Sequence, residues 1–272
     1  ANARRGWWRF PTTWMGCVDA RITGGRDVTD DPPTNDGSGP DTRFPKYYWP
    51  CHTSYNAWYG TNSSRNNCNT TPSGSLKYKS GLGTSLGPNK YCSQAVLPMT
   101  ASKTTVLNAV NTLQPDGNTH VVLGAAWAWR MLSPRWQGLG GGEMNDNGLP
   151  LAYDTPLMNK GVVLRTDGDQ TISSSVRGAY NYLSAGDLGT TSQSAAEAEL
   201  DERLLEVCTS MKANGITIYT VAFGTGISGS TQTLLQSCAS KPEYYFFSPT
   251  GDALQQSFRQ IGDSLANLRI SL

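Results

Sequence analysis

An aspartate placed directly after a short apolar run is the residue whose type and position most clearly suggest chemistry. The segment Gly161-Val-Val-Leu-Arg-Thr-Asp-Gly-Asp169 contains a run of β-forming residues, Val162 to Leu164, that ends in a polar corner with Asp167 and Gly168. In an open α/β sheet, ligands bind in the crevice outside the carboxyl ends of the strands. Asp167 is therefore well placed to hold a hard cation or another ligand.

A hydroxyl further upstream is the second candidate ligand. Asp116-Gly-Asn-Thr119 leads into the apolar segment Val121 to Met131, which predicts a loop that presents Thr119 at the start of a helix. Hydroxyls and one or two carboxylates suit Mg²⁺, which keeps several waters, and Ca²⁺ also takes oxygen ligands. We expect Thr119 and Asp167 to lie close together as a metal site at the carboxyl edge of the sheet. A structural alternative stays open, in which Asp167-Gly168 is a turn and Thr119 is a helix N-cap.

The overall composition and charge argue against some classes of function. The chain has 272 residues, enough for one large or two small domains, and its charged fraction of 16% is low for a soluble domain. A net charge of +1 gives no argument for nucleic-acid binding. The sequence contains no apolar run of the ~20 residues that a membrane-spanning helix needs.

Six cysteines favour an oxidising compartment, because an even number in Gly- and Asn-rich surroundings is typical of disulfides. No pair has C-x-x-C spacing, which argues against a zinc site, and six buried free thiols are the alternative. Cys208 and Cys238 are expected on the buried faces of two successive helices, so we predict a disulfide between them. For the remaining four we favour the pairings Cys17–Cys92 and Cys51–Cys68, although spacing alone does not fix them.

The chain divides into two regions of different character. Residues 1–94 are rich in Cys, Pro, Gly, Asn and Tyr and show almost no helical periodicity, which indicates an irregular insertion held by disulfides and aromatic packing. Residues 95–272 alternate between helical and strand patterns. Helices are expected at 104–113, 121–131, 195–213, 232–240 and 253–268, and strands at 162–164, 216–223 and 244–247.

Strands that alternate with helices predict an α/β fold with a mostly parallel sheet covered on both faces. In the first helix, Val106, Leu107, Val110 and Leu113 fall on one apolar face. Three strands are few for about five helices, and residues 1–94 offer no convincing further strand. We therefore expect the sheet to lack a central strand, or a separate polypeptide to supply it.

A set of weak motifs in a fixed order resembles one known family. The segments are Trp14-Met-Gly-Cys-Val-Asp-Ala-Arg21, Leu97-Pro-Met-Thr100, Gly117-Asn-Thr119, Trp127-Ala-Trp-Arg-Met-Leu-Ser-Pro134, Val163-Leu-Arg-Thr-Asp-Gly168, Cys208-Thr-Ser-Met-Lys-Ala-Asn-Gly-Ile-Thr-Ile-Tyr219 and Cys238-Ala-Ser240. Together they are similar to the C-terminal part of TadG-like proteins of bacterial tight-adherence (Flp) pilus systems. Those proteins carry a von Willebrand factor A domain with a cysteine-bearing insertion.

The resemblance implies a periplasmic or extracellular cell-envelope module that acts in pilus biogenesis or adhesion, with an N-terminal membrane anchor. It also implies that this chain begins after the first strand of the A domain and after its Asp-x-Ser-x-Ser metal motif. Thr119 matches the second metal loop of such domains and Asp167 the third. Mg²⁺ or Ca²⁺ is therefore expected to bind weakly or not at all here, and the expected partners are proteins, including the missing segment or another subunit.

Catalysis is not expected. Gly83-Thr-Ser-Leu-Gly87 matches the nucleophile-elbow pattern of hydrolases, but no apolar strand precedes it and Pro88 follows. The two histidines, His52 and His120, have no second ligand at metal spacing and are expected at the surface or as capping residues. The leading hypothesis is a non-catalytic binding or assembly module. The alternatives are a purely structural subunit with a decayed metal site and an envelope hydrolase.

Overall fold

The computed structural model describes residues 14–34, 37, 39, 41–49, 84 and 89–267. Its α-helices are α1 (Lys103–Asn111), α2 (Val121–Leu132), α3 (Gly142–Asp146), α4 (Gln193–Ala213), α5 (Gly229–Cys238) and α6 (Gly251–Asn267). Its strands are β1 (Gly161–Thr166), β2 (Thr217–Phe223) and β3 (Tyr245–Ser248), and short 3-10 helices lie at Thr23–Val28, Pro134–Trp136, Leu183–Ala185 and Pro242–Tyr244. Every helix and strand expected from the sequence is therefore present.

The strands form a parallel sheet in the order β1-β2-β3. This confirms the expected α/β class with parallel strands and flanking helices. Among the described residues no fourth strand pairs with β1, which pairs only with β2, from Gly161 opposite Thr217 to Thr166 opposite Ala222. Outside the sheet, the described part of residues 1–94 forms an isolated bridge between Val18 and Lys46.

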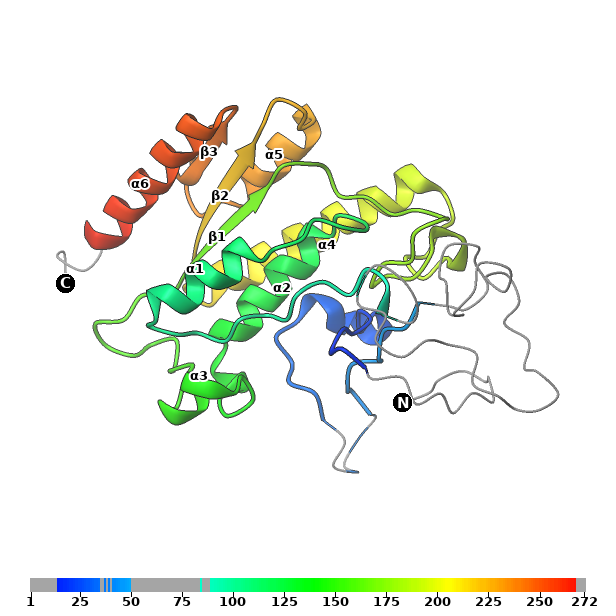
Figure 1. Ribbon diagram of the computed structural model, residues 1–272, viewed down its shortest axis with the longest axis horizontal. Helices are drawn as coiled ribbons and strands as arrows, with labels where there is room; N and C mark the ends of the chain where they lie inside the picture. The colour runs from blue at the N-terminus through cyan, green and yellow to red at the C-terminus, as the bar shows by residue number, and fades with distance from the viewer. Residues whose placement is uncertain are drawn as a thin grey trace.

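The two faces of the sheet pack against different helices, as Figure 1 shows with α6 on one side and α2, α4 and α5 on the other. Alternation along the strands explains this division, because successive side chains point to opposite faces. Val162, Leu164 and Ile218 face the large core formed with α2, α4 and α5. Tyr219 and Val221 face α6 and its Ile261.

The helix ends follow local chemistry. Ser102 caps α1 by accepting a hydrogen bond from the Thr105 N–H, and Ser228 caps α5 in the same way from Thr231. Gly215 stops α4 with a φ of 75°, a left-handed conformation that favours glycine. No helix among the described residues is both long and apolar enough to cross a membrane.

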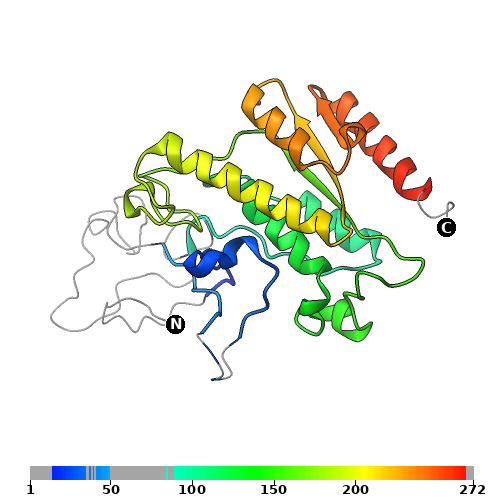
Figure 2. The ribbon, with the colours of Figure 1, turned by 180° about the vertical axis from the view of Figure 1, so that it is seen from behind.

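Helix α1 has the apolar face that the sequence predicts, but this face is not buried. No residue of α1 is buried, and its apolar residues remain open to solvent: Val106 (41% exposed), Leu107 (48%) and Val110 (56%). Figures 1 and 2 show α1 on the side of α2 remote from α4. The periodic apolar face is therefore real, but nothing in the described chain covers it.

The described part of the N-terminal region shares the main core. Val28 is buried there against the helices. The Arg130 guanidinium of α2 donates to the Asp27 carbonyl at 2.8 Å and to the Thr29 carbonyl at 3.1 Å. The fully buried Asp27 carboxylate accepts hydrogen bonds from Arg203 of α4 at 2.8 Å and from the Tyr180 hydroxyl at 2.9 Å.

Two disulfides join distant parts of the described chain. Cys208 of α4 and Cys238 of α5 are bonded with their Cα atoms 5.3 Å apart, as predicted from the buried faces of these helices. Cys17 is bonded to Cys92 with a Cα separation of 5.6 Å. Cys51 and Cys68 lie outside the described residues. In the chain-entropy model a crosslink spanning 30 residues contributes about 3–4 kcal/mol to stability.

Candidate functional site

The corner that follows β1 presents Asp167 to solvent. The Thr166 hydroxyl closes the corner by donating to the Gly168 carbonyl at 2.7 Å and accepting from the Gly168 N–H at 3.3 Å. The Asp167 side chain is 71% exposed, and its Oδ2 forms a long ion pair with Arg165 Nη2 at 3.6 Å. An exposed carboxylate in so long an ion pair is free to accept another partner.

The loop that carries Thr119 is bonded directly to the chain beyond Asp167. The Thr119 N–H donates to the Thr171 hydroxyl at 2.9 Å, and the Thr119 carbonyl accepts from the Thr171 N–H at 2.9 Å. The Gln170 side chain also accepts from the Val122 N–H at 3.0 Å. These bonds hold the two loops side by side at the carboxyl edge of the sheet.

Thr119 is not the N-cap of α2, because His120 occupies that position and makes no side-chain capping bond. The N-cap alternative for Thr119 is therefore wrong. Within the described part of the chain its hydroxyl makes no hydrogen bond. The loops of Thr119 and Asp167 meet, whereas the direct approach of their side chains to a cation stays a prediction.

A third loop, between β2 and α5, is attached to the same corner. The Asp169 carboxylate accepts hydrogen bonds from the N–H of Ser228 at 3.1 Å and from its hydroxyl at 2.9 Å. Partial burial opposes ionisation of Asp169, but hydrogen bonds from Thr231 and Ser228 outweigh it and lower the pKa of this carboxyl. Asp169 is therefore an ionised carboxylate that holds the Ser228 loop at the edge of the sheet, and it is not free to bind a further ligand.

Sequence reasoning missed Asp169, Gln170, Asp201 and Ser228. Gln170 donates to Asp201 of α4 at 2.9 Å, and burial raises the pKa of the Asp201 carboxyl. Two of them could have been found from the sequence, because Asp169 stands two residues after Asp167 and Ser228 stands directly before a helix. Across the described residues, no three acidic, histidine or cysteine side chains converge as a complete metal cluster.

No family model matches the sequence, and no curated protein matches it. The chain is similar to solved structures of proximal thread matrix protein 1 from the mussel byssus, one of them with a zinc-occupied MIDAS motif, at 18% identity and a TM-score of 0.37 over 60% of this chain and 30% of that one. It is also similar to the pilus adhesin SpaC from Lactobacillus rhamnosus GG, at 14% identity and a TM-score of 0.38 over 62% of this chain and 21% of that one.

The chain thus spans less than a third of the length of these solved proteins.

Proposed function

We propose that this chain is a non-catalytic binding module and that the carboxyl edge of its sheet is the binding face. The observation that carries the proposal is the joining of three loops at that edge. Thr171 holds the Thr119 loop, and Asp169 holds the Ser228 loop, while the Asp167 carboxylate stays exposed. A rigid, hydrogen-bonded platform with one exposed acceptor suits recognition, because fixed groups lose little entropy on binding.

The binding face is proposed to work through a divalent cation held by Thr119 and Asp167. One hydroxyl and one carboxylate leave several positions of an octahedral Mg²⁺ shell to water or to a carboxylate from a partner. Such a site binds the cation weakly by itself and more strongly when a partner supplies a further oxygen. Mg²⁺ and Ca²⁺ are both compatible with these oxygen ligands.

A protein partner at the edge of β1 is the second part of the proposal. The Thr217 N–H donates to the Lys160 carbonyl at 2.9 Å, so the backbone groups of even-numbered β1 residues point toward β2. In a parallel ladder the groups of odd-numbered residues then point to the open edge. Gly161, Val163 and Arg165 make no backbone hydrogen bond there within the described chain, and another strand is the natural occupant of such an edge.

The setting of this module follows from its covalent chemistry and from the resemblance in sequence. Disulfides persist in oxidising compartments, and two are present in the described residues. We therefore propose a location in the periplasm or outside the cell. The ordered motifs of this chain that resemble those of tight-adherence proteins favour a role in pilus assembly or adhesion.

A purely structural subunit is the alternative, favoured by the lack of a complete metal cluster among the described residues. Titration with Mg²⁺ monitored by amide NMR shifts separates the two hypotheses. We expect saturable shifts confined to the loops of Thr119, Asp167 and Ser228, lost in Asp167→Ala. The matched control is Asp263→Ala, which removes an exposed carboxylate from α6 and keeps the response. Shifts that do not saturate, or that survive Asp167→Ala, favour the structural subunit.

A further inference from the structure

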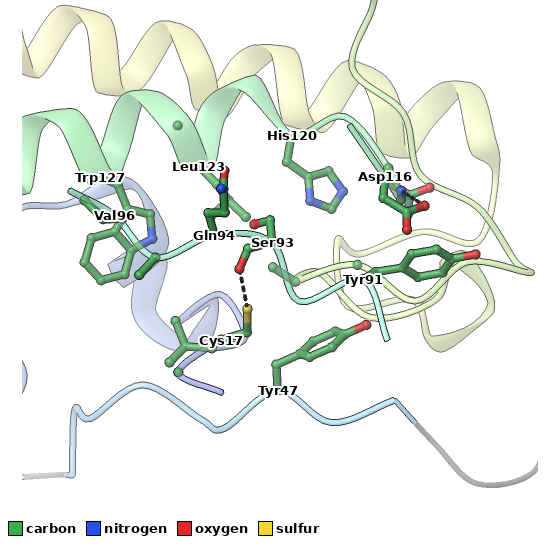
Figure 3. Close-up of a pocket in the computed structure, with 18 of the residues that line it drawn as sticks. Cys17, Tyr47, Tyr91, Ser93, Gln94, Val96, Asp116, His120, Leu123 and Trp127 are labelled. Atoms are coloured by element: carbon green, nitrogen blue, oxygen red, sulfur yellow. Dashed lines mark hydrogen bonds between the residues drawn. The ribbon is translucent and has the colours of Figure 1, made fainter. Parts of the chain in front are cut away.

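A cavity of about 500 Å³ opens beside the first two turns of α2. Figure 3 shows Leu123 and Trp127 of α2 above it, with Tyr91 and Tyr47 below. A volume of this size is typical of a small-molecule site. Besides Tyr47, its walls come from residues in four parts of the chain: 15–18, 91–96, 116–127 and 177–179.

Two aromatic rings of the wall are fixed by contacts from outside the cavity. Trp127 stacks on Phe44 with ring centroids 5.1 Å apart, and Tyr91 meets Trp49 edge-on at 5.0 Å. Neither Phe44 nor Trp49 lines the cavity, so both contacts hold their rings from behind. The rings are therefore in place before a ligand binds, and a flat apolar group gains most from such walls.

Cations lie behind the same two rings. Lys90 Nζ is 4.7 Å from the ring centroid of Tyr91, and Arg130 Cζ is 5.1 Å from that of Trp127. Neither cation lines the cavity, so each approaches its ring from the side away from it. A cation draws the π electrons of a ring toward itself and leaves the opposite face less negative. Such a face is best met by the negative face of an electron-rich ring.

The backbone of Tyr91 adds an independent sign of a built site. Its φ is 62°, a left-handed conformation that is strained for a bulky residue. The neighbouring Cys92 is bonded to Cys17 on the other side of the cavity, which fixes this segment. Strain of this kind persists where the surrounding structure over-determines it, and it concentrates at ligand clamps.

The ring of His120 is packed against a glycine at one end of the cavity. A Cβ on Gly178 would collide with Cε1 of His120, so a larger residue at this position would displace the ring. His120 is thus neither the surface residue nor the side-chain cap that the sequence suggested.

The charges around the cavity favour a neutral ligand. Among the described lining residues Arg177 is the only arginine or lysine, and its guanidinium donates to both oxygens of Asp19, at 2.8 and 2.7 Å. Asp116 is the only carboxylate of the same lining, so an anionic ligand would meet a like charge and no unpaired cation. A cationic ligand would compete with the two cations that already lie behind the aromatic rings.

We propose that this cavity binds a neutral, electron-rich aromatic ring, such as an indole or an aryl ether. The ring of the ligand stacks against the rings of Tyr91 and Trp127. Neither Thr119 nor Asp167 lines the cavity, so the site does not depend on a cation at the sheet edge. Asp167→Ala therefore leaves binding of the aromatic ligand intact.

Three ligands of similar size test the proposal: the electron-rich ether 4-methylanisole, the electron-poor 4-methylbenzonitrile and the anion 4-methylbenzoate. Each is titrated into the protein and followed by amide NMR shifts. We expect the ether to bind about threefold more tightly than the nitrile, which lies within the range of a favourable aromatic pair. The benzoate should bind at least about tenfold more weakly than the ether, because its charge would be buried without a partner. No saturable binding of the ether, or binding of the nitrile or the benzoate that is as tight, overturns the proposal.

Two further ligands identify the source of the ring. Free 3-methylindole and a blocked tripeptide with a central tryptophan carry the same indole. Tighter binding of the tripeptide assigns the site to a side chain of a protein partner, and tighter binding of 3-methylindole assigns it to a small molecule. Saturable binding of neither overturns the proposal.

Two glycine substitutions locate the binding. Gly124 lines the cavity from α2 and has no atom within 4 Å of the position that a Cβ would take, so Gly124→Trp fills the cavity without a backbone clash. It is expected to abolish binding of 4-methylanisole. Gly262→Trp places the same side chain on α6 at a position equally open and is expected to keep binding. Binding that survives Gly124→Trp, or that Gly262→Trp weakens equally, contradicts the site.

A third substitution tests the cation behind Tyr91. Lys90→Met removes the charge and keeps a flexible side chain, so the preference for the ether over the nitrile should fall from about threefold toward equality. A ratio that stays unchanged contradicts the role of this cation. If Lys90→Met does not fold, the ligand series and the glycine pair still decide.

Discussion

Asp27 shows how much of this molecule depends on single pairs of distant residues. Its carboxylate has no solvent exposure and is neutralised by Arg203, 176 positions away in sequence. Removing one partner of a buried ion pair leaves an uncompensated charge. We expect Arg203→Leu to lower the free energy of unfolding by about 3 kcal/mol, measured by urea denaturation. Arg259→Leu on the exposed face of α6 is the control and should change stability little. Equal effects of the two substitutions would refute a stabilising role for the buried pair.

His120 gives a pH dependence whose direction follows from its burial. Its pKa of about 4 in the folded protein lies below the ordinary value of 6.5, so the unfolded chain binds the proton more tightly. The stabilisation is therefore fully present above pH 6.5 and is lost as the pH falls from 6.5 toward 4. A shift of this size corresponds to about 3 kcal/mol.

The measurement is urea unfolding at pH 7.5 and pH 4.5 for the wild type and for His120→Phe. Other groups also titrate in this range, so the decisive quantity is the difference between the two proteins. We expect the wild type to lose more stability than the variant on acidification. An identical loss in both would show that His120 is not neutral and buried in solution.

These residues also mark what the sequence could not reveal. Asp167 and Thr119 were recognisable because each stands at a boundary between a polar loop and an apolar run. Asp27, Gly178 and the ring of His120 gain their roles from contacts across more than fifty positions, and no local pattern reports such contacts. The buried Nε2 of His120 has no hydrogen-bond partner among the described residues, and this is recognisable only once Gly178 is placed against the ring.

At the scale of elements, the helices and strands were predictable because their signals are local. Strand β1 is a β-branched run that ends in a turn, and α4 stops at a glycine with positive φ. Whether the apolar face of α1 is buried could not be predicted from the sequence. Periodicity shows that a helix has an apolar face, whereas burial of that face depends on whether another element covers it.

A matched pair of valines tests this distinction. Val110 on α1 is 56% exposed, and Val122 on α2 is completely buried. We expect Val110→Ala to change the free energy of unfolding by less than about 0.5 kcal/mol, since alanine also favours helix. Val122→Ala should cost about 2 kcal/mol through lost burial and a cavity. A large loss from Val110→Ala, measured by the same urea unfolding, would mean that α1 is covered in solution.

At the scale of the whole molecule, the open edge of β1 is the feature that determines how this chain associates with other polypeptides. β1 has the apolar sequence of an interior strand, yet within the described chain it has a neighbour on one side only. Val163 faces the same side of the sheet as α6 and is still 38% exposed. The apolar face of α1 and the edge of β1 are therefore two surfaces that a further polypeptide would cover.

Two adjacent proline substitutions distinguish an open edge from a paired one. The N–H of Leu164 points toward β2, so Leu164→Pro removes a ladder bond and inserts a ring between paired strands; we expect it to cost at least about 3 kcal/mol. The N–H of Val163 points to the open edge, so Val163→Pro removes no bond of the described sheet. It should cost clearly less in urea unfolding while blocking any strand that pairs with β1. If Val163→Pro is as destabilising as Leu164→Pro, the edge of β1 is already occupied in the folded protein. If Val163→Pro is tolerated and prevents capture of a β-strand partner, the edge of β1 is the docking site. A parallel strand added at this edge would end beside Asp167, where its last residues could supply the oxygen ligands that the cation still needs.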